Sequence, residues 1–346
     1  MAGSAELERR ELKVRGRKPF SIIIAAYNEE RFIRSKILSL IDQEWWVEGS
    51  EVIVVSGGSR DGTNAILAEF RSHRDIVLMI YQEHLTKIEA VNLAVSRSRN
   101  DILVFSDCRQ TMNAGAIPRL LDNFDDESVG TVTATLVNGN GSSVSQIRRL
   151  LNVAARAPNA KGSCLNVFGA LYAQRKCVFR AIPTDIIFDD LFVVVSTVLQ
   201  NKRVVQERDA IIYDVNFSRY YNGERLERLA RGLLLFVWNH AALIMELPLC
   251  FRMRFLGFKY GKLVSPFVLS MCIVYTVYRV LPVMSVETVA IGALLCAVVF
   301  AIKGSREVIC LFVRLNVYFM AASFRFVFGN GRQTTWQKLK PQQFRE

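Results

Sequence analysis

Acidic residues stand at two places in the sequence where their chemistry could be used. Asp107 directly follows the apolar run 102–105, which is the pattern of a buried strand that ends on an acid, and Arg109 stands two positions later. A carboxylate at such a strand end is suited to a divalent metal ion, for which one or two protein carboxylates commonly suffice. Asp189 and Asp190 have apolar neighbours, and burial among such neighbours raises the pKa of a carboxyl group and makes it a better general base.

A repeating order of strands and helices positions these acids. Continuous apolar runs predict strands that are buried on both faces, and apolar residues at helical spacing follow them. The predicted strands are 20–27, 51–55, 75–81, 102–106, 130–137 and 203–213. Helices are predicted around 61–71 and 87–97, and a further helix is predicted to begin at Asn28 as its cap, with Glu29 and Glu30 in its first turn. This order is typical of a parallel sheet covered by helices, in which ligands bind at the carboxyl ends of the strands. Tyr27, Ser56 and Asp107 are expected at that edge.

Composition separates a soluble part of the chain from an apolar part. The chain has 346 residues and is 51% hydrophobic, but long apolar runs with few charges extend only from about Leu263 to Phe328. The first residues are charged and lack the apolar core of a signal peptide, so we expect the soluble part to stay in the cytoplasm. Much of the net charge of +12 lies at 252–262 and 332–345, beside the apolar runs. This position favours contact with anionic membrane lipids and argues against nucleic acid as a partner.

The apolar part predicts a multi-pass protein of the cell (inner) membrane. The expected order is a cytoplasmic domain at 1–228, then a membrane region at 229–346 with an interfacial helix at 229–250, spans at 263–284 and 286–302, an interfacial segment or third span at 307–328, and a C-terminal tail. Because 307–328 contains Arg314 and precedes a basic tail, we favour the interface for it. The tail would then remain cytoplasmic.

Short motifs follow one another in a fixed order along nearly the whole chain. They are AAYNEE at 25–30, VVSGGSRDGT at 54–63, LTKIEAVNLAV at 85–95, FSDCRQ at 105–110, FGALYAQRK at 168–176, IPTDIIFDDLFV at 182–193, ERLERLARG at 224–232, KLVSPF at 262–267 and GRQTTWQKLK at 331–340. In this order they resemble the motifs of membrane-associated family 2 glycosyltransferases, the inverting group that includes cellulose, hyaluronan and chitin-oligosaccharide synthases. The resemblance implies an α/β fold, a GT-A type, Rossmann-like nucleotide-diphospho-sugar transferase domain followed by interfacial and transmembrane helices.

The resemblance also implies a role for individual residues. Asp190 would be the catalytic base, and Asp107 would bind Mg²⁺ or Mn²⁺. Nucleotide-sugar contacts are implied for Ala26, Tyr27, Asn28, Glu29, Ser56, Asp61, Lys87, Asp107, Arg225 and Arg228. Acceptor contacts are implied for Gly169, Ala170, Asp189 and Trp336. The open alternatives are helix capping for Asn28, Glu29 and Asp61, membrane-surface contact for Arg225 and Arg228, and an interfacial anchor for Trp336.

Three departures from the family pattern bear on specificity. Gly57 replaces an Asp that often faces the uracil or ribose, so the choice of base is open. Arg109 replaces the second acid of the D-x-D motif, and it could pair with a phosphate, with the acceptor or with Asp107. In the Q-x-x-R-W motif, Arg225 and Leu229 replace the glutamine and the tryptophan. This last change favours transfer of one or a few sugars over long processive synthesis.

The sequence therefore predicts an inverting glycosyltransferase at the cytoplasmic face of a membrane. The donor is expected to be a nucleotide sugar, with UDP as the nucleotide, and the acceptor a growing polysaccharide or a lipid-linked glycan. One alternative is a processive polysaccharide synthase. An alternative of another class is a non-catalytic membrane scaffold that only binds nucleotide sugars, against which the intact Lys87, Asp107 and Asp190 argue.

Overall fold

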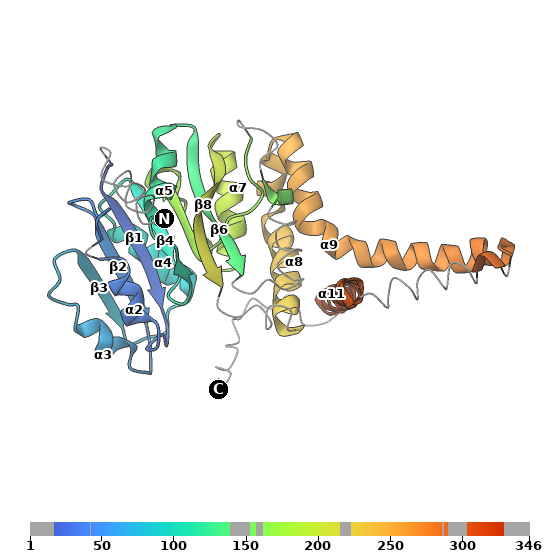
Figure 1. Ribbon diagram of the computed structural model, residues 1–346, viewed down its shortest axis with the longest axis horizontal. Coiled ribbons are helices and arrows are strands. Elements are labelled where there is room, and N and C mark those ends of the chain that lie inside the picture. Colours follow the sequence, from blue (N-terminus) through green and yellow to red (C-terminus); the bar gives the residue numbers. More distant parts are fainter. Residues whose placement is uncertain are drawn as a thin grey trace. The chain divides into compact units, whose positions relative to one another are not determined.

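Eight strands of the described chain form one mixed sheet in the computed structural model of the protein (Figure 1). The structure describes residues 17–41, 43–138, 153–156, 162–214, 223–285, 287–289 and 303–328. In the order β3-β2-β1-β4-β7-β6-β8-β5, the strands are Ile76–Tyr81, Glu51–Gly57, Phe20–Ala26, Ile102–Ser106, Leu171–Arg175, Val129–Asn138, Arg203–Asp214 and Thr111–Met112. Strands β3, β2, β1 and β4 are parallel, β7 is antiparallel to both β4 and β6, and β8 is parallel to β6 and antiparallel to β5. The predicted parallel sheet is confirmed for the first four strands.

Helices cover both faces of this sheet. They are α2 (Ile33–Leu38), α3 (Thr63–Ala68), α4 (Lys87–Arg97), α5 (Ala116–Asp122) and α7 (Asp189–Leu199), with short 3₁₀ turns at Asn123–Asp125 and Lys176–Val178. Ile22 of β1 belongs to the same core cluster as Ile33 and Ile37 of α2. Ile23, the next residue of β1, instead lines a pocket together with Val91 of α4. Successive strand residues point to opposite faces, so β1 is buried on both sides, as its continuous apolar run predicts.

The predicted helix cap at Asn28 is wrong. Asn28 has a φ of +55°, in the left-handed region, and α2 begins only at Ile33 with Phe32 as its N-cap residue. The side-chain Oδ1 of Asn28 accepts a hydrogen bond from the backbone N of Arg60 at 2.8 Å. Asn28 therefore joins the loop after β1 to the loop after β2, and it does not cap its own helix.

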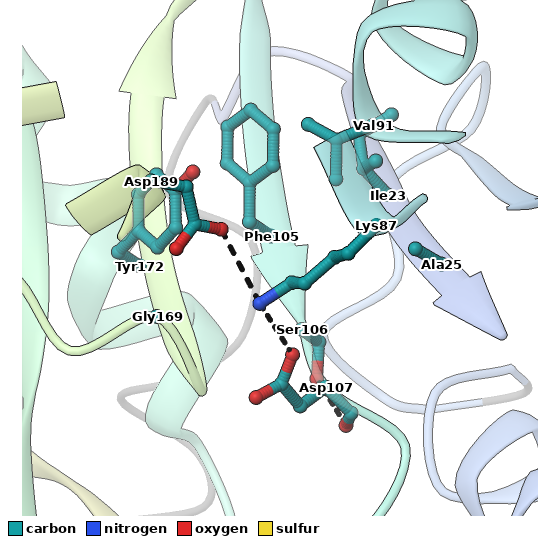
Figure 2. Close-up of a pocket in the computed structure, with 10 residues that line it drawn as sticks. All are labelled: Ile23, Ala25, Lys87, Val91, Phe105, Ser106, Asp107, Gly169, Tyr172 and Asp189. Atoms are coloured by element: carbon teal, nitrogen blue, oxygen red, sulfur yellow. Dashed lines mark hydrogen bonds and ion pairs between the residues drawn. The ribbon is translucent and has the colours of Figure 1, made fainter. Parts of the chain in front are cut away.

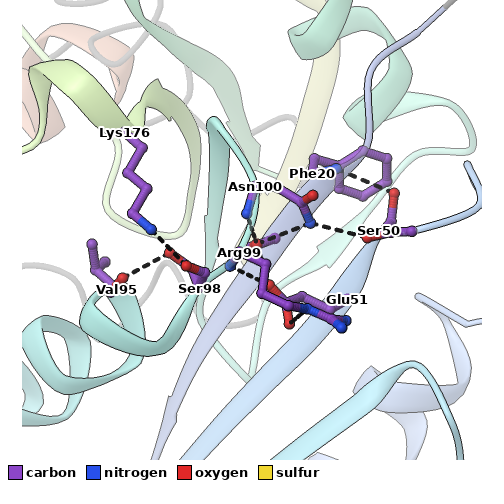
Figure 3. Close-up of polar contacts among 10 residues, drawn as sticks. Phe20, Ser50, Glu51, Val95, Ser98, Arg99, Asn100 and Lys176 are labelled. Atoms are coloured by element: carbon purple, nitrogen blue, oxygen red, sulfur yellow. Dashed lines mark hydrogen bonds and ion pairs between the residues drawn. The ribbon is translucent and has the colours of Figure 1, made fainter.

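A buried polar network ties together the amino ends of β1, β2 and β4 (Figure 3). Glu51 is 1% exposed, and its carboxylate accepts hydrogen bonds from Ser21 Oγ at 2.7 Å and from the backbone N and Nε of Arg99 at 2.7 and 3.1 Å. Asn100 Nδ2 donates to Ser21 Oγ at 3.2 Å and to the carbonyl of Gly49 at 3.1 Å. These bonds offset the cost of burying the Glu51 charge.

The chain divides into two compact units. The sheet unit comprises Met1–Tyr221 and Ala241–Tyr260, and the helical unit comprises Asn222–His240 and Gly261–Glu346. Helix α8 (Gly223–Glu246) passes from one unit to the other at His240, where its backbone is not helical, and α9 (Leu249–Tyr275) passes between them after Tyr260. Residues 241–260 thus belong with the sheet, which differs from the expected domain boundary at 228.

Helices α8, α9 and α11 (Lys303–Phe328) supply the described part of the helical unit. Arg325 Nη1 of α11 lies 2.8 and 2.9 Å from the two carboxylate oxygens of Glu227 of α8. Ser265 Oγ of α9 donates to Asn316 Oδ1 of α11 at 3.3 Å. Helix α11 therefore contacts both other helices within this unit.

Two helical stretches in the described residues are long and apolar enough to cross a membrane, Glu227–Glu246 and Leu249–Arg279. The expected interfacial helix at 229–250 falls on α8 and the first residues of α9. The expected span at 263–284 falls on the later part of α9 and the π-helical and 3₁₀ turns at Thr276–Val280 and Leu281–Val283. The helix begins earlier than expected because its first turns pack into the sheet unit.

The remaining expectations for the membrane region are only partly accessible to the structure. The expected segment at 307–328 lies within α11. Apart from 287–289, the expected span at 286–302 lies outside the described residues, and so does the tail with Trp336.

The Glu51 network generates a prediction about stability. Glu51→Gln should lower the free energy of unfolding by about 1–3 kcal/mol, because the amide nitrogen would face donors that the carboxylate now satisfies. Denaturant titration of the full chain in detergent measures this change. The control is Arg99→Met, since the Arg99 side chain is 66% exposed and its backbone N–H keeps its bond to Glu51. A similar small loss in both variants would show that the network does not hold the strand ends together.

Candidate active site

Lys87 lies between two carboxylates in a pocket at the carboxyl edge of the sheet (Figure 2). Its Nζ is 3.0 Å from Oδ1 of Asp107 and 3.3 Å from Oδ2 of Asp189. Burial works against the charge of the ammonium group, but the two carboxylates outweigh it and raise the pKa of Lys87 well above its ordinary value. The pocket therefore contains a permanent positive charge flanked by two acids.

The local sequence explains why Lys87 stands in this position. Lys87 is the first residue of α4, and the preceding Thr86 forms a capping box with Glu89, in which Thr86 Oγ1 accepts from the Glu89 backbone N at 3.2 Å and Glu89 Oε2 accepts from the Thr86 backbone N at 2.8 Å. Asp107 directly follows β4, and its backbone N donates to the carbonyl of Ala170 at 3.1 Å, just before β7. The start of α4 and the end of β4 are thus both fixed by hydrogen bonds.

Asp189 and Asp190 form the first turn of α7. Asp189 Oδ1 accepts a hydrogen bond from the backbone N of Asp190 at 3.0 Å, so one of its oxygens serves the helix start while the other faces Lys87. Asp190 Oδ1 is buried and has no hydrogen-bond partner in the described part of the chain. Burial raises the pKa of Asp190 above the ordinary aspartate value. This is the chemistry of a poised general base.

The pocket brings together several of the residues that the sequence singled out. Its lining consists of Ile23, Ala25, Lys87, Val91, Phe105, Ser106, Asp107, Gly169, Tyr172 and Asp189. At Gly169, a Cβ atom would stand 3.7 Å from Asp189 Oδ1 and 3.8 Å from Lys87 Nζ. Ala170 holds Asp107 through its backbone carbonyl. Of the predicted acceptor residues, Gly169, Ala170 and Asp189 therefore lie around the Lys87 ion pairs.

Several predicted nucleotide-binding residues join the loops after β1 and β2. The backbone N of Glu29 donates to Thr63 Oγ1 at 2.8 Å. Asp61 Oδ1 accepts from the Thr63 backbone N at 3.0 Å, and its Oδ2 accepts from the Glu30 backbone N at 3.2 Å. The N-cap residue of α3 is Gly62, so Asp61 is not the helix cap that one alternative assigned to it. Ser56 is buried and its hydroxyl donates to Asn64 Oδ1 at 2.7 Å. Direct contact of these residues with a nucleotide stays a prediction.

Arg109 forms an ion pair with Glu29. The partner of Asp107 is Lys87, and not Arg109 as one alternative had it. Arg109 Nε lies 2.8 and 2.9 Å from the two Glu29 carboxylate oxygens. Burial raises the pKa of Glu29, and the hydrogen bond and charge of Arg109 oppose this. The pair links the loop after β1 to the loop after β4.

Gly57, where the family pattern has an acid, lies too close to a neighbouring loop to carry a side chain. A Cβ atom at Gly57 would stand 2.6 Å from the Cβ of Leu85, and one at Gly58 would stand 2.8 Å from the backbone of Glu83 and His84. Gly58 also has a φ of +68°. An aspartate at position 57 would require the 83–85 loop to move.

The other predicted contacts have different positions. Ala26 is buried at the end of β1, and the Tyr27 ring meets the His84 ring edge-on with centroids 4.7 Å apart. Arg228 is exposed on α8 in the helical unit. The side chain of Arg225 and the whole of Trp336 lie outside the described residues.

Sequence reasoning missed Lys259, which it assigned to lipid contact. Lys259 is only 6% exposed, and its Nζ donates to Asn166 Oδ1 at 2.6 Å. The signal was the four-residue spacing of Phe251, Phe255 and Lys259, which places all three on one buried face of α9. Arg254 is also turned inward and donates to the carbonyl of Arg156 at 2.8 Å.

The described residues contain no group of three or more His, Cys, Asp or Glu side chains that could hold a metal ion. The lining of the pocket instead has two carboxylates, of which Asp107, with its side chain 34% exposed, is more accessible than Asp189, at 16%. Such a set fits a divalent cation that takes most of its remaining ligands from substrate phosphates and water. Asp107 is the residue that would hold it.

Comparisons with known proteins find sequence relatives of part of the chain. Residues 21–180 match glycosyl transferase family 2. The poly-beta-1,6-N-acetyl-D-glucosamine synthase of Staphylococcus aureus (strain COL) is 22% identical over 197 residues, 54% of this chain and 47% of that protein. Glycosyltransferase YfnE of Bacillus subtilis (strain 168) is 37% identical over 87 residues, 25% of this chain and 22% of that protein. The chain thus spans less than half the length of these curated relatives.

A solved structure extends the likeness over most of the chain. The mannosyltransferase PcManGT from Pyrobaculum calidifontis, determined in complex with GDP-Man and Mn²⁺, superposes with a TM-score of 0.71 at 20% identity, covering 94% of this chain and 95% of that one. The fold is therefore that of a GT-A type nucleotide-diphospho-sugar transferase, as the sequence predicts.

Proposed function

We propose that this glycosyltransferase, whose family 2 domain lies at residues 21–180, transfers a sugar with inversion from a nucleotide sugar to a glycan acceptor. The observation that carries the proposal is the meeting of Lys87, Asp107 and Asp189 in one pocket, with Asp190 as the next residue of the same helix turn. These groups come from three separate elements at the edge where parallel sheets bind ligands.

In the proposed reaction, Asp190 accepts the proton of the acceptor hydroxyl as that oxygen forms a bond to the anomeric carbon. The bond from that carbon to the diphosphate breaks on the opposite face, and the departing nucleoside diphosphate keeps the electron pair. Lys87 supplies positive charge close to the pocket and favours the departure of the diphosphate. Gly169 leaves space beside Lys87 and Asp189 in which an acceptor could lie.

The proposed donor is a UDP-sugar, in line with the family that the motifs resemble. Gly57 leaves the identity of the nucleotide base open, because a glycine has no side chain that could contact a uracil. The solved relative in complex with GDP-Man supports GDP-mannose as the second donor to test. The proposed acceptor is a polysaccharide or a lipid-linked glycan, which the synthase relative from Staphylococcus aureus supports. Product length would separate transfer of a few sugars from processive synthesis.

A divalent ion is part of the proposal. Asp107 would bind Mg²⁺ or Mn²⁺ together with oxygens of the donor diphosphate. When bound, the ion would neutralise charge that develops on the leaving diphosphate.

We further propose that the protein acts at the cytoplasmic face of a membrane. The two long apolar helical stretches support membrane association, and nucleotide sugars must reach the pocket from the side where they are made. Spans at 263–284 and 286–302 with an interfacial segment at 307–328 would place both the sheet unit and the tail on that side. The turn near Ser285 would face the outside.

Asp190→Asn tests the function directly. Purified protein is screened with UDP- and GDP-sugars and a glycan acceptor, and release of the nucleoside diphosphate is measured. The variant should fold and bind nucleotide but lose roughly 10²- to 10⁴-fold in transfer rate. Because burial raises the pKa of Asp190, the wild-type rate should fall with decreasing pH at values above the ordinary aspartate range. Turnover by neither protein would favour the non-catalytic scaffold, and equal turnover would remove Asp190 as the base.

Titration with Mn²⁺ tests the metal site. Asp107→Ala should abolish the enhancement of nucleotide binding by Mn²⁺, because it removes the more exposed of the two carboxylates in the pocket. Arg109→Ala is the matched control at the same loop: it should keep the enhancement, since arginine has no lone pair to give a cation. Isothermal titration with UDP and with GDP measures both. Wild-type enhancement in the Asp107 variant would place the ion elsewhere.

Cysteine labelling in intact cells tests the topology. In a background without the seven native cysteines, Gln343→Cys should resist a membrane-impermeant thiol reagent until the membrane is opened. Ser285→Cys is the control and should label in intact cells. Labelling at position 343 in intact cells would mean that 307–328 spans the membrane.

A further inference from the structure

Lys36 of α2 is a buried lysine whose amino group bonds to the loop that carries Asp107. Only 6% of Lys36 is exposed, and its Nζ donates to the carbonyl of Gln110 at 2.6 Å and, more weakly, to Ser106 Oγ at 3.4 Å. A lysine is rarely buried unless a carboxylate pairs with it, and within the described part of the chain Lys36 forms no such ion pair. Proteins keep such locally unfavourable features chiefly at functional sites, so the contact with the loop indicates a role of its own.

The two acceptors lie at opposite ends of one loop. Ser106 is the last residue of β4, and Gln110 directly precedes β5. One amino group thus spans the loop from its first residue to its last, with Asp107 between them. Because both bonds come from the same nitrogen, they fix the distance between the two ends. The loop cannot open without breaking at least one of them.

Other contacts hold the interior of the same loop. The backbone N of Asp107 donates to the carbonyl of Ala170 at 3.1 Å. Cys108 is 6% exposed and belongs to the hydrophobic core, and Arg109 pairs with Glu29. Each of these partners comes from a different part of the chain. The Asp107 carboxylate is thus presented from a backbone that the protein holds on several sides.

A fixed position of the Asp107 carboxylate favours the binding of a metal ion. Loss of a residue that orients a metal ligand typically lowers metal affinity by about 10- to 100-fold, although that residue never touches the ion. An ion that binds through one protein carboxylate takes its other ligands from diphosphate and water. No second protein ligand would then compensate for a misplaced Asp107.

We propose that Lys36 is a positioning residue for metal-assisted binding of the donor: by bonding Gln110 and Ser106, it holds the loop in the conformation that presents Asp107 to a divalent cation. The proposal rests on the proposed function through the metal site at Asp107. Burial lowers the pKa of Lys36, but an amine keeps N–H donors in either protonation state. The positioning therefore depends on the hydrogen bonds and not on the charge.

Hydrogen exchange tests the tether without any ligand. Lys36→Met keeps an unbranched side chain but has no donor, so the backbone amides of 107–112 should exchange roughly tenfold faster or more in the full chain in detergent. Lys176→Met is the matched control, because Lys176 Nζ donates to the carbonyl of Ser98 at 2.5 Å at the amino edge of the sheet (Figure 3). It removes the same kind of bond and should leave exchange at 107–112 unchanged.

Titration with Mn²⁺ and nucleotide tests what the tether does. Isothermal titration measures the affinity for UDP and for GDP with and without Mn²⁺. In Lys36→Met, the enhancement by Mn²⁺ should fall by about 10- to 100-fold, while the affinity measured without metal stays near the wild-type value. Lys176→Met should retain the full enhancement. A merely structural role of Lys36 would weaken nucleotide binding equally with and without the ion, or leave both affinities unchanged.

Lys36→Gln is the second variant if Lys36→Met does not fold. It keeps a polar group, but its amide nitrogen is one bond closer to the backbone and falls short of the Gln110 carbonyl. The same faster exchange and the same loss of enhancement are expected. If neither variant folds, Lys36 serves the fold as a whole, and the proposal is wrong.

Equal exchange at 107–112 in the Lys36 and Lys176 variants would overturn the proposal, and so would full Mn²⁺ enhancement in the Lys36 variant. Asp107→Ala separates these results from failure of the proposed metal site. If Asp107→Ala loses the enhancement and Lys36→Met keeps it, the metal site stands and the positioning role falls. If Asp107→Ala keeps the enhancement, or the wild type shows none, the metal site of the proposed function is wrong and the positioning role falls with it.

Discussion

The ion pairs of Lys87 with Asp107 and Asp189 are the interaction on which the site depends. Two carboxylates that share a small pocket repel each other, and the ammonium group between them removes this repulsion. The sheet makes the arrangement possible, because the parallel β1 and β4 end at one edge and the antiparallel β7 begins there, with Ala170 bonded to Asp107. Without Lys87, these two carboxylates would have no positive charge between them.

Buried carboxylates at the two edges of the sheet differ in how fully they are hydrogen-bonded. At the amino edge, both carboxylate oxygens of Glu51 accept hydrogen bonds, from Ser21 and from the backbone and side chain of Arg99. The carboxylate is thus engaged by the protein itself. At the carboxyl edge, Asp190 keeps a buried oxygen without a partner in the described chain. Native proteins rarely leave such atoms unsatisfied, which is why the same type of residue is structural at one edge and points to function at the other.

The sequence predicted the strands well because continuous apolar runs report burial on both faces. It failed where contacts join distant parts of the chain. Asn28 looked like a helix cap, but its partner is the backbone of Arg60 in another loop. The sequence left a phosphate, the acceptor and Asp107 open as partners of Arg109, and in the structure Arg109 bonds Glu29. Lys259 looked like a lipid contact beside an apolar run, and only its spacing from buried aromatic residues indicated otherwise.

The charges at the site constrain how a donor and a metal ion can bind. The pocket lining holds two carboxylates, Asp107 and Asp189, and the charge of Lys87 compensates only one of them. A nucleotide sugar adds the negative charge of its diphosphate, so its binding is favoured when a cation arrives with it. A cation at Asp107 alone would have a single protein carboxylate and a lysine beside it, so the ion in turn gains most of its ligands from the diphosphate. In the proposed site, each ligand would therefore raise the affinity for the other by the same factor.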